Sequence, residues 1–85
     1  MQAREYKKEK GESPTIVAFD IPERFRARRA MLREALGMLD YKLLQQSVWI
    51  GKNKIPAEFL EDLRDAGIIR FVHIFEVKKE GTILQ

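Results

Sequence analysis

The fold is decided by residues 15–23, whose sequence is TIVAFDIPE. In residues 15–20 β-branched and aromatic side chains occupy both alternating positions, which is typical of a strand covered on two sides. Asp20, Pro22 and Glu23 follow directly. An aspartate, a proline inside the first turn and a glutamate three residues after the aspartate together predict a helix start of the capping-box type. A strand that turns directly into a helix is therefore the first unit of the fold.

The helix that follows has one apolar side. Phe25, Leu32, Leu36 and Leu39 recur at helical spacing, and an arginine lies at the edge of this stripe. Asp40 comes directly after the last leucine. Aspartate tolerates the left-handed conformation that usually ends a helix at glycine, so we expect the helix to end there.

Extended and helical segments alternate again in the second half of the chain. Residues 42–50 predict an extended stretch whose middle, residues 45–47, forms a bulge or a narrow hairpin. A polar turn at residues 51–54 precedes a helix that Pro56 opens and Gly67 closes, and residues 68–78 predict a last strand. This order predicts an α+β fold, a ferredoxin-like βαββαβ sandwich with two helices on one face of a four-stranded antiparallel sheet.

Composition limits the domain organisation and the chemistry. The chain has 85 residues, no cysteine and one histidine, so one small domain without disulfides or a cysteine-based zinc site is expected. Residues 1–14 are mostly charged and predict a flexible tail or linker remnant before a domain at residues 15–85. No apolar run is long enough to span a bilayer and no leader is evident, so we expect a cytoplasmic protein without a membrane partner.

The second face of the predicted sheet is also apolar. Two helices cover only one face, yet the first and last strands carry apolar residues at both alternating positions. Exposed apolar area costs about 25 cal/mol per Å², so we expect this face to be buried in a homodimer. The expected interface residues are Val17, Phe19, Trp49, Phe71, His73 and Phe75.

Asp20 is a candidate metal ligand and catalytic residue. It stands at a strand end beside a tight turn, and two copies brought together by a two-fold axis could hold one Mg²⁺ that polarises a phosphodiester. Capping of the first helix explains the same residue without catalysis.

Positive charge is concentrated in the first helix. The net charge is +3 and the isoelectric point is about 9.4, but residues 21–33 carry five arginines and one glutamate, which gives +4. Guanidinium groups bind phosphate oxygens, so this helix is a candidate nucleic-acid surface, and a solvated helix face is the alternative. The arginines concerned are Arg24, Arg26, Arg28, Arg29 and Arg33.

Two further residues are assigned to packing. His73 has no second histidine or cysteine to share a metal, so it is interpreted as a sheet or interface residue. Trp49 could stack on a base, but its neighbours in residues 47–50 favour packing in the core or in a dimer.

Three segments together resemble a known family. They are residues 17–23 (VAFDIPE), the helix with Arg29, Leu32 and Arg33, and residues 44–50 (LQQSVWI). Over residues 15–78 the chain resembles the Cas2 family (CRISPR-associated protein two), and it is more similar still to the Cas2-like middle domain of PaaX-family repressors of phenylacetic-acid metabolism.

The resemblance implies a ferredoxin-like homodimer joined through its sheets. In the CRISPR branch it implies that Asp20 binds a divalent metal at the dimer axis in members that cleave RNA or DNA, whereas other members bridge DNA for the spacer integrase. There, tail residues such as 81–84 often extend the sheet of the partner. In the repressor branch the domain follows a winged helix and mainly dimerises.

The resemblance therefore carries two functional expectations. The first is a homodimerisation and nucleic-acid-associated module of a PaaX-like transcriptional regulator, without efficient catalysis, which binds DNA rather than RNA and follows an upstream winged-helix domain. The alternative is a Mg²⁺-dependent endoribonuclease or endodeoxyribonuclease, or a spacer-integration subunit that works with a CRISPR integrase, which uses paired Asp20. Pro22, Glu23 and Trp49 look more similar to the repressor branch, while Asp40 stands where both branches usually have glycine.

Overall fold

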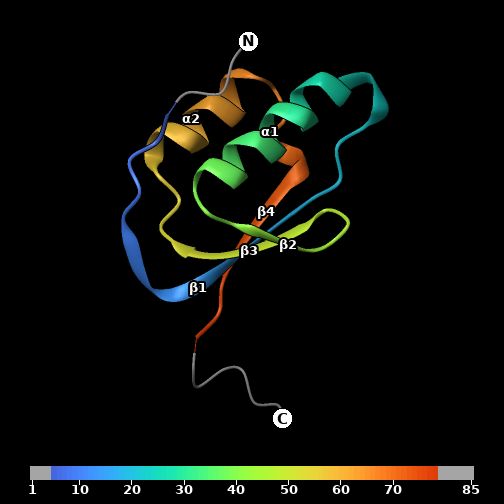
Figure 1. The fold of residues 1–85 in the computed structure, drawn as a ribbon. Helices are drawn as coiled ribbons and strands as arrows, with labels where there is room; N and C mark the ends of the chain where they lie inside the picture. The colour runs from blue at the N-terminus through green and yellow to red at the C-terminus, as the bar shows by residue number, and fades with distance from the viewer. Residues whose placement is uncertain (1–4, 79–85) are drawn as a thin grey trace.

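A computed structural model describes residues 5–78 of the chain (Figure 1). Strands and helices alternate as the sequence predicts, and the α+β class is confirmed. The helices and strands are β1 (Lys10–Phe19), η1 (Glu23–Phe25), α1 (Arg26–Met38), β2 (Lys42–Gln45), β3 (Val48–Asn53), α2 (Ala57–Asp65), η2 (Ile69–Phe71) and β4 (Val72–Glu76), where η denotes a 3₁₀ helix.

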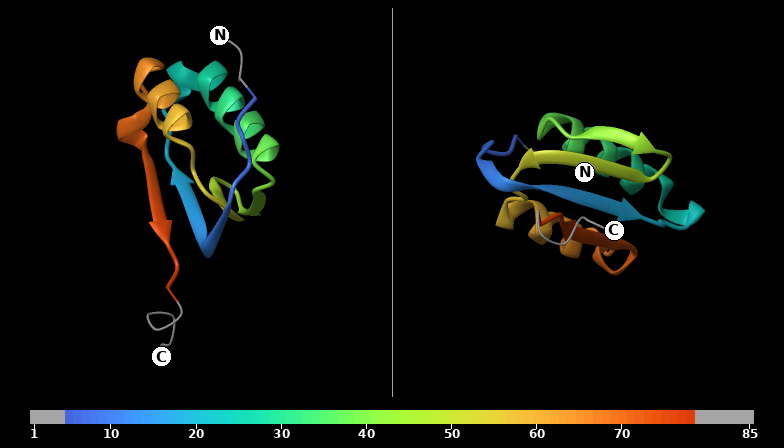
Figure 2. Two further views of the ribbon diagram at one scale, coloured as in Figure 1. Left: turned by 90° about the vertical axis from the view of Figure 1, so that its left-hand side faces the viewer. Right: turned by 90° about the horizontal axis from the view of Figure 1, so that it is seen from below.

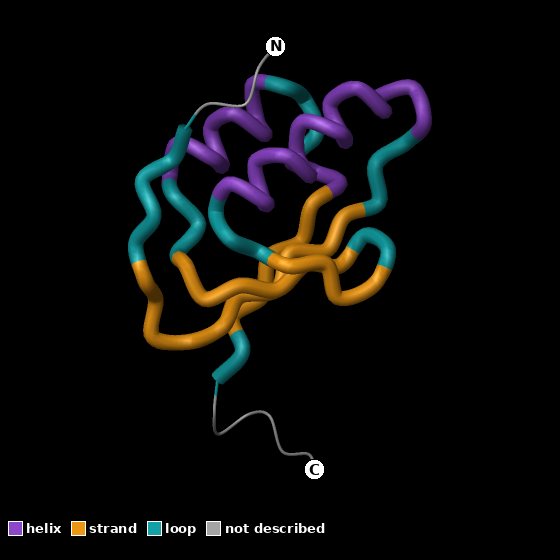
Figure 3. The backbone as a smooth tube through the Cα atoms, in the orientation of Figure 1, coloured by secondary structure: helices purple, strands orange, loops and turns teal. Residues whose placement is uncertain are grey.

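The four strands form one antiparallel sheet in the order β2-β3-β1-β4. Both α-helices lie on the same side of it, which is plain in Figure 3, where the purple helices stand together on one side of the orange strands. The ferredoxin-like arrangement predicted from the sequence is therefore confirmed. Within residues 5–78 no helix covers the other side of the sheet, as the view from below in Figure 2 shows.

β1 is longer than the sequence indicates. It begins at Lys10 rather than at Thr15, and its pairing with β3 shifts register between these two residues. The backbone N–H of Val77 donates to the carbonyl of Pro14, 2.9 Å away, so the start of β1 also lies beside the end of the last strand. Main-chain pairing needs no apolar side chains, which is why the charged composition of this segment gave no sign of a strand.

Residues 5–9 lie across the helices. The ring of Tyr6 meets Phe59 edge-on at 5.6 Å between centroids, and its hydroxyl donates to a carboxylate oxygen of Asp62 at 2.6 Å. The carbonyl of Glu9 accepts the backbone N–H of Lys54 at 2.7 Å. These contacts lie within the segment predicted to be a tail. The sheet-extending segment expected at residues 81–84 lies outside the described residues.

The predicted chain reversals are present. Asp40 ends the first helical segment with a φ of 65°, and Gly67 ends the second with a φ of 76°, both in the left-handed region. Residues 45–47 form a narrow hairpin in which Gln46 has a φ of 29°, and the pairing of β2 with β3 is irregular beside it, between Leu43 and Gln45. Both alternatives offered by the sequence, a hairpin and an irregularity, therefore occur together.

Two boundaries differ from the sequence-based expectation. β3 continues to Asn53, through the residues predicted to be a polar turn. The last strand begins at Val72, because Ile69–Phe71 form a turn of 3₁₀ helix in the segment predicted as strand. This turn brings Phe71 beside Phe25 at the start of α1.

The core lies between the helices and the sheet. Leu32 and Leu36 of α1 and Phe59 of α2 are almost completely buried there. Gly51 of β3 leaves room for the ring of Tyr41, since a Cβ atom at this position would overlap that ring. The Tyr41 hydroxyl donates to the carbonyl of Asn53 at 2.6 Å, which ties the start of the hairpin to the end of β3.

Candidate functional site

The side of the sheet without helices is apolar at its centre. Residues directly opposite each other in an antiparallel pair point to the same face, so the pairing assigns each side chain to a side. Ile50, Ile16 and Phe75 form one row across the sheet, and Val48, Ala18 and His73 form the next. We call this surface the open face; its residues are Ile16, Ala18, Val48, Ile50, His73 and Phe75.

The pairing reverses the expected orientation of β1. Val17 and Phe19 were predicted to face a partner, but they are 0% and 5% exposed and belong to the core beneath the helices. Ile16 and Ala18 occupy the open face instead and are partly exposed. The side chains on both faces of β1 are apolar. Their alternation along the strand therefore could not indicate which face is buried in the core.

The other predicted interface residues divide between the two sides. His73 and Phe75 lie on the open face, where Phe75 is 55% exposed. Trp49 lies opposite Val17 and packs against the core, which removes it from the open face. Phe71 belongs to η2 and also packs against the core.

Glu23 is the ion-pair partner of two of the five predicted arginines. Its carboxylate lies 3.5 Å from a guanidinium nitrogen of Arg26 and 3.3 Å from one of Arg29. Arg29 also donates to the carbonyl of Ile21 at 3.2 Å and is only partly exposed. These two arginines therefore hold the start of α1 in place as well as carrying charge.

Three other arginines gather around a pair of phenylalanines. The rings of Phe25 and Phe71 lie 6.0 Å apart and join η1 to η2. The guanidinium groups of Arg24 and Arg28 lie 4.8 Å and 5.3 Å from the centre of the Phe25 ring, and that of Arg70 lies 5.0 Å from the centre of the Phe71 ring. We call Arg24, Arg28 and Arg70 the arginine triad.

Arg70 was not predicted as part of the basic surface. It is distant in sequence from the first helix and stands in a segment predicted as a strand. The sequence therefore offered no reason to place its side chain beside the arginines of that helix. A signal was nevertheless present, because Arg24–Phe25 and Arg70–Phe71 are the same dipeptide and each ends a 3₁₀ helix. Arg33, the fifth predicted arginine, is exposed on α1 and makes no ion pair within residues 5–78.

Asp20 directly follows β1 and is exposed. The alternation of side chains along that strand assigns Asp20 to the side of the open face. Its backbone N–H donates to the carbonyl of Phe71 at 3.0 Å. Pro22 and Phe25 stand at the N-caps of η1 and α1, and no side chain caps either helix, so the capping interpretation of Asp20 is wrong. Within residues 5–78 no three side chains of the metal-ligating types lie together, so one chain has no three-ligand group at Asp20.

The hydroxyl of Tyr41 has a shifted acid–base equilibrium. Burial raises the pKa of Tyr41 above its usual value of 10.0, and a hydrogen bond with the side chain of Thr15 lowers it in part. Both residues lie on the helix side of the sheet, so this shift belongs to the core and not to the open face.

None of the helices in the described part of the chain is long and apolar enough to cross a bilayer.

Comparison with known proteins gives one clear similarity. The family model described as PaaX protein central Cas2-like domain matches residues 10–84 of this chain. No curated protein and no solved structure matches it. The match covers most of the chain and begins at the residue where β1 begins. The chain therefore belongs to the family of PaaX central Cas2-like domains.

Proposed function

We propose that the chain is a homodimerisation module that associates with nucleic acid, as part of a PaaX-like transcriptional regulator in the cytoplasm, without efficient catalysis. The observation that carries this proposal is the apolar open face. Its central residues cannot be covered by the two helices, which pack on the other side of the sheet. Membership of the PaaX central Cas2-like family supports the regulatory context.

A second copy of the chain is the occupant that fits the open face. Ile16, Ile50 and Phe75 form a row that crosses three strands, and the adjacent row contains Val48 and Ala18. When a two-fold axis brings two such faces together, apolar surface is removed from water on both copies. Each Å² of apolar area buried in this way stabilises the dimer by about 25 cal/mol. Lys42 and Lys52 share this side of the sheet with Ile50 and are exposed, so they lie at the border of the contact, where their ammonium groups stay in water.

Sedimentation equilibrium tests this pairing with two matched variants. Phe75 and Leu43 are both 55% exposed, but Phe75 lies on the open face and Leu43 lies opposite Trp49 on the helix side. We expect Phe75→Lys to weaken self-association at least about tenfold, because it places a charge in the interface. We expect Leu43→Lys to have little effect.

A wild-type chain that sediments as a monomer at high micromolar concentration would reject the dimer. Equal weakening by both variants would also reject it, because a general effect of added charge would then explain the result. Loss of folding is checked by circular dichroism of each variant.

The arginine triad is the part of the basic surface that best fits phosphate. Arg26 and Arg29 are paired with Glu23, whereas Arg24, Arg28 and Arg70 make no ion pair within residues 5–78. A guanidinium group over an aromatic ring keeps its charge and its N–H edges available while its flexible stem is restrained. The triad therefore offers restrained cations for the phosphate backbone, with DNA as the expected partner.

Salt-dependent binding to a short DNA duplex tests the triad. Arg28 and Arg26 lie two residues apart at the start of α1 and are both exposed, but only Arg26 has an acidic partner. We expect Arg28→Gln to lower the slope of log K against log salt by about 1, and Arg26→Gln to change it by less than about 0.5. Equal changes in the two variants would reject a specific role for the triad, and tighter binding to an RNA duplex of the same sequence would reject DNA as the partner.

A Mg²⁺-dependent endonuclease that uses paired Asp20 is the second candidate. The observation in its favour is that Asp20 is exposed at the end of β1 and is not occupied by helix capping. Because no three metal-ligating side chains lie together within residues 5–78, this activity would require Asp20 of a second copy to complete the site, so it depends on the dimer proposed above.

A further inference from the structure

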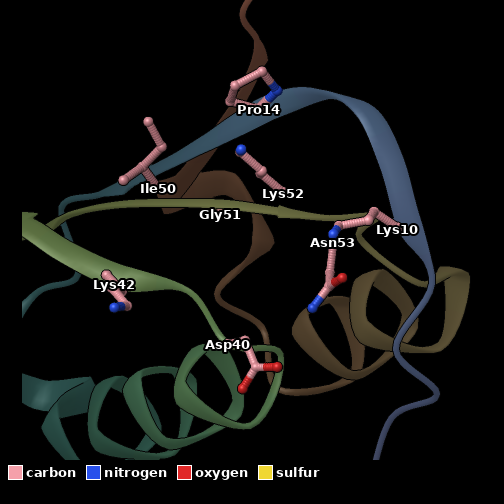
Figure 4. Close-up of a pocket in the computed structure, with 8 residues that line it drawn as sticks. All are labelled: Lys10, Pro14, Asp40, Lys42, Ile50, Gly51, Lys52 and Asn53. Atoms are coloured by element: carbon pink, nitrogen blue, oxygen red, sulfur yellow. The ribbon is translucent and has the colours of Figure 1, made fainter.

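A pocket lies at the end of the sheet where β3 ends, between the start of β2 and the start of β1 (Figure 4). It is a cavity of about 500 Å³, open to solvent, in the size range of small-molecule sites. Its lining residues are Lys10, Pro14, Asp40, Lys42, Ile50, Gly51, Lys52 and Asn53.

Lysines surround the apolar part of this pocket. Lys42 lies directly opposite Ile50 across the β2–β3 pair, so the two side chains share a face of the sheet. Lys52 follows Ile50 by two residues on β3 and therefore also lies on that face. Figure 4 shows the side chains of Ile50 and Pro14 on the same side of the strands as Lys52, with Lys10 at the opposite end of the pocket from Lys42. An apolar surface is thus bordered by three ammonium groups.

The positive charge of this pocket is not balanced by its own residues. Lys10, Lys42 and Lys52 are exposed, and none of them forms an ion pair within residues 5–78. Asp40 is the one acid among the lining residues, and its carboxylate already lies 3.2 Å from the ammonium group of Lys8, outside the pocket. Three like charges without a counter-charge repel one another, and an anion between them relieves that repulsion.

We propose that this pocket binds a small organic anion, with a phosphate or carboxylate group held by Lys42 and Lys52, a short apolar body against Ile50 and Pro14, and Lys10 adding positive charge at the far end of the pocket. The proposal goes beyond the DNA contact, because it does not involve the arginine triad, and beyond the dimer, because it assigns a small ligand; it shares Ile50 with the open face, so a dimer formed there covers part of the pocket. Lysine is suited to such a site, since its flexible ammonium group acts as a point charge that needs no fixed geometry of the ligand.

Titration monitored by amide chemical shifts tests the proposal, with hexyl phosphate, inorganic phosphate and hexanol as probes. We expect hexyl phosphate to shift the amides of Gly51 and Lys52 and to bind at least about tenfold more tightly than either of the other probes, since only it satisfies both parts of the pocket. Its affinity should fall as salt is added, because exposed charges are screened. Equal affinity for hexyl phosphate and hexanol, or for hexyl phosphate and inorganic phosphate, would overturn the proposal.

Two double variants with the same charge change provide the control. Lys42→Gln with Lys52→Gln should weaken hexyl phosphate at least about fivefold, while Lys7→Gln with Lys78→Gln, which removes two exposed lysines outside the pocket, should weaken it less than about twofold. Equal losses in both pairs would reject the pocket in favour of net charge.

Two further arms separate this result from the other proposals. The titrations are repeated with Phe75→Ser, which weakens the dimer: the same dependence on Lys42 and Lys52 is expected, with binding at least as tight as in the wild-type chain because a partner no longer covers Ile50, and loss of that dependence would overturn the proposal. A single-stranded oligonucleotide is then added to the complex with hexyl phosphate. We expect it not to displace the probe; displacement that also requires Lys42 and Lys52 would assign the pocket to nucleic-acid phosphates and overturn the small-molecule assignment.

Discussion

The two sides of the sheet are built from equally apolar strands but have different surroundings. On β1, Val17 is fully buried under the helices, while its neighbour Ile16 points to the open face and remains partly exposed. The helix side therefore supplies the burial that folds the chain, and the open face contributes little to folding of the single chain. These apolar residues, which the single chain does not bury, are the basis of the proposed dimer.

The largest effect should come from a charge on the helix side. Val17→Asp buries an uncompensated carboxylate in the core and should cost more than about 4 kcal/mol, so that the chain does not fold. Ile16→Asp, one residue away, should cost about 1 kcal/mol of monomer stability and still fold. Urea denaturation followed by circular dichroism measures both; similar losses would show that the two faces do not differ as described.

Gly51 allows a test of how tightly the helix side of β3 is packed. Gly51→Ala places a methyl group in the space of the Tyr41 ring and should cost about 2 kcal/mol, within the range of overpacking. In a Tyr41→Ala background the same change should cost less than about 0.5 kcal/mol, because the overlapping ring is gone. A double-mutant cycle from thermal unfolding gives the coupling, and additive effects would contradict the overlap.

Tyr41 should make stability depend on alkaline pH. Its pKa is raised in the folded chain by burial, so the unfolded chain loses the proton first and the contribution is complete below about pH 10. Stability should then fall as pH rises through the folded-state pKa. Tyr41→Phe should cost about 1 kcal/mol at pH 7, through the lost bond to Asn53, and should make the decline above pH 10 less steep. Denaturation between pH 7 and pH 11 tests this, and parallel curves would contradict it.

The smallest effect is expected at the rim of the open face. Asp20→Ala should change stability by less than about 0.5 kcal/mol, because the Asp20 side chain caps neither η1 nor α1. A loss near 1 kcal/mol would instead indicate a capping role. The same variant, incubated with Mg²⁺ and nucleic acid beside the wild-type chain, separates the two candidate functions: cleavage that Asp20→Ala abolishes would support the endonuclease.

Sequence patterns predicted the order of the elements well. The helical spacing of Leu32, Leu36 and Leu39 and the left-handed ends at Asp40 and Gly67 are local properties, so the residues themselves carry the information.

The orientation of β1 and the arginine triad could not be predicted in the same way. Both faces of β1 carry apolar residues, so packing against the helices decides which face is buried in the core. The triad depends on η2, which brings Arg70 and Phe71 to the start of α1 from the other end of the chain. Strand β1 between Lys10 and Pro14 was missed because backbone pairing there does not need apolar side chains.

Trp49 makes the chain its own optical probe. It is the single tryptophan, it lies opposite Val17, and the Nε1 atom of its indole is buried without a hydrogen-bond partner among residues 5–78. Its emission should therefore move to longer wavelength when the helices separate from the sheet and water reaches the ring. Partners that cover only Ile16, Ile50 and Phe75 lie on the opposite side and should leave that emission almost unchanged, so one fluorophore can distinguish unfolding from assembly.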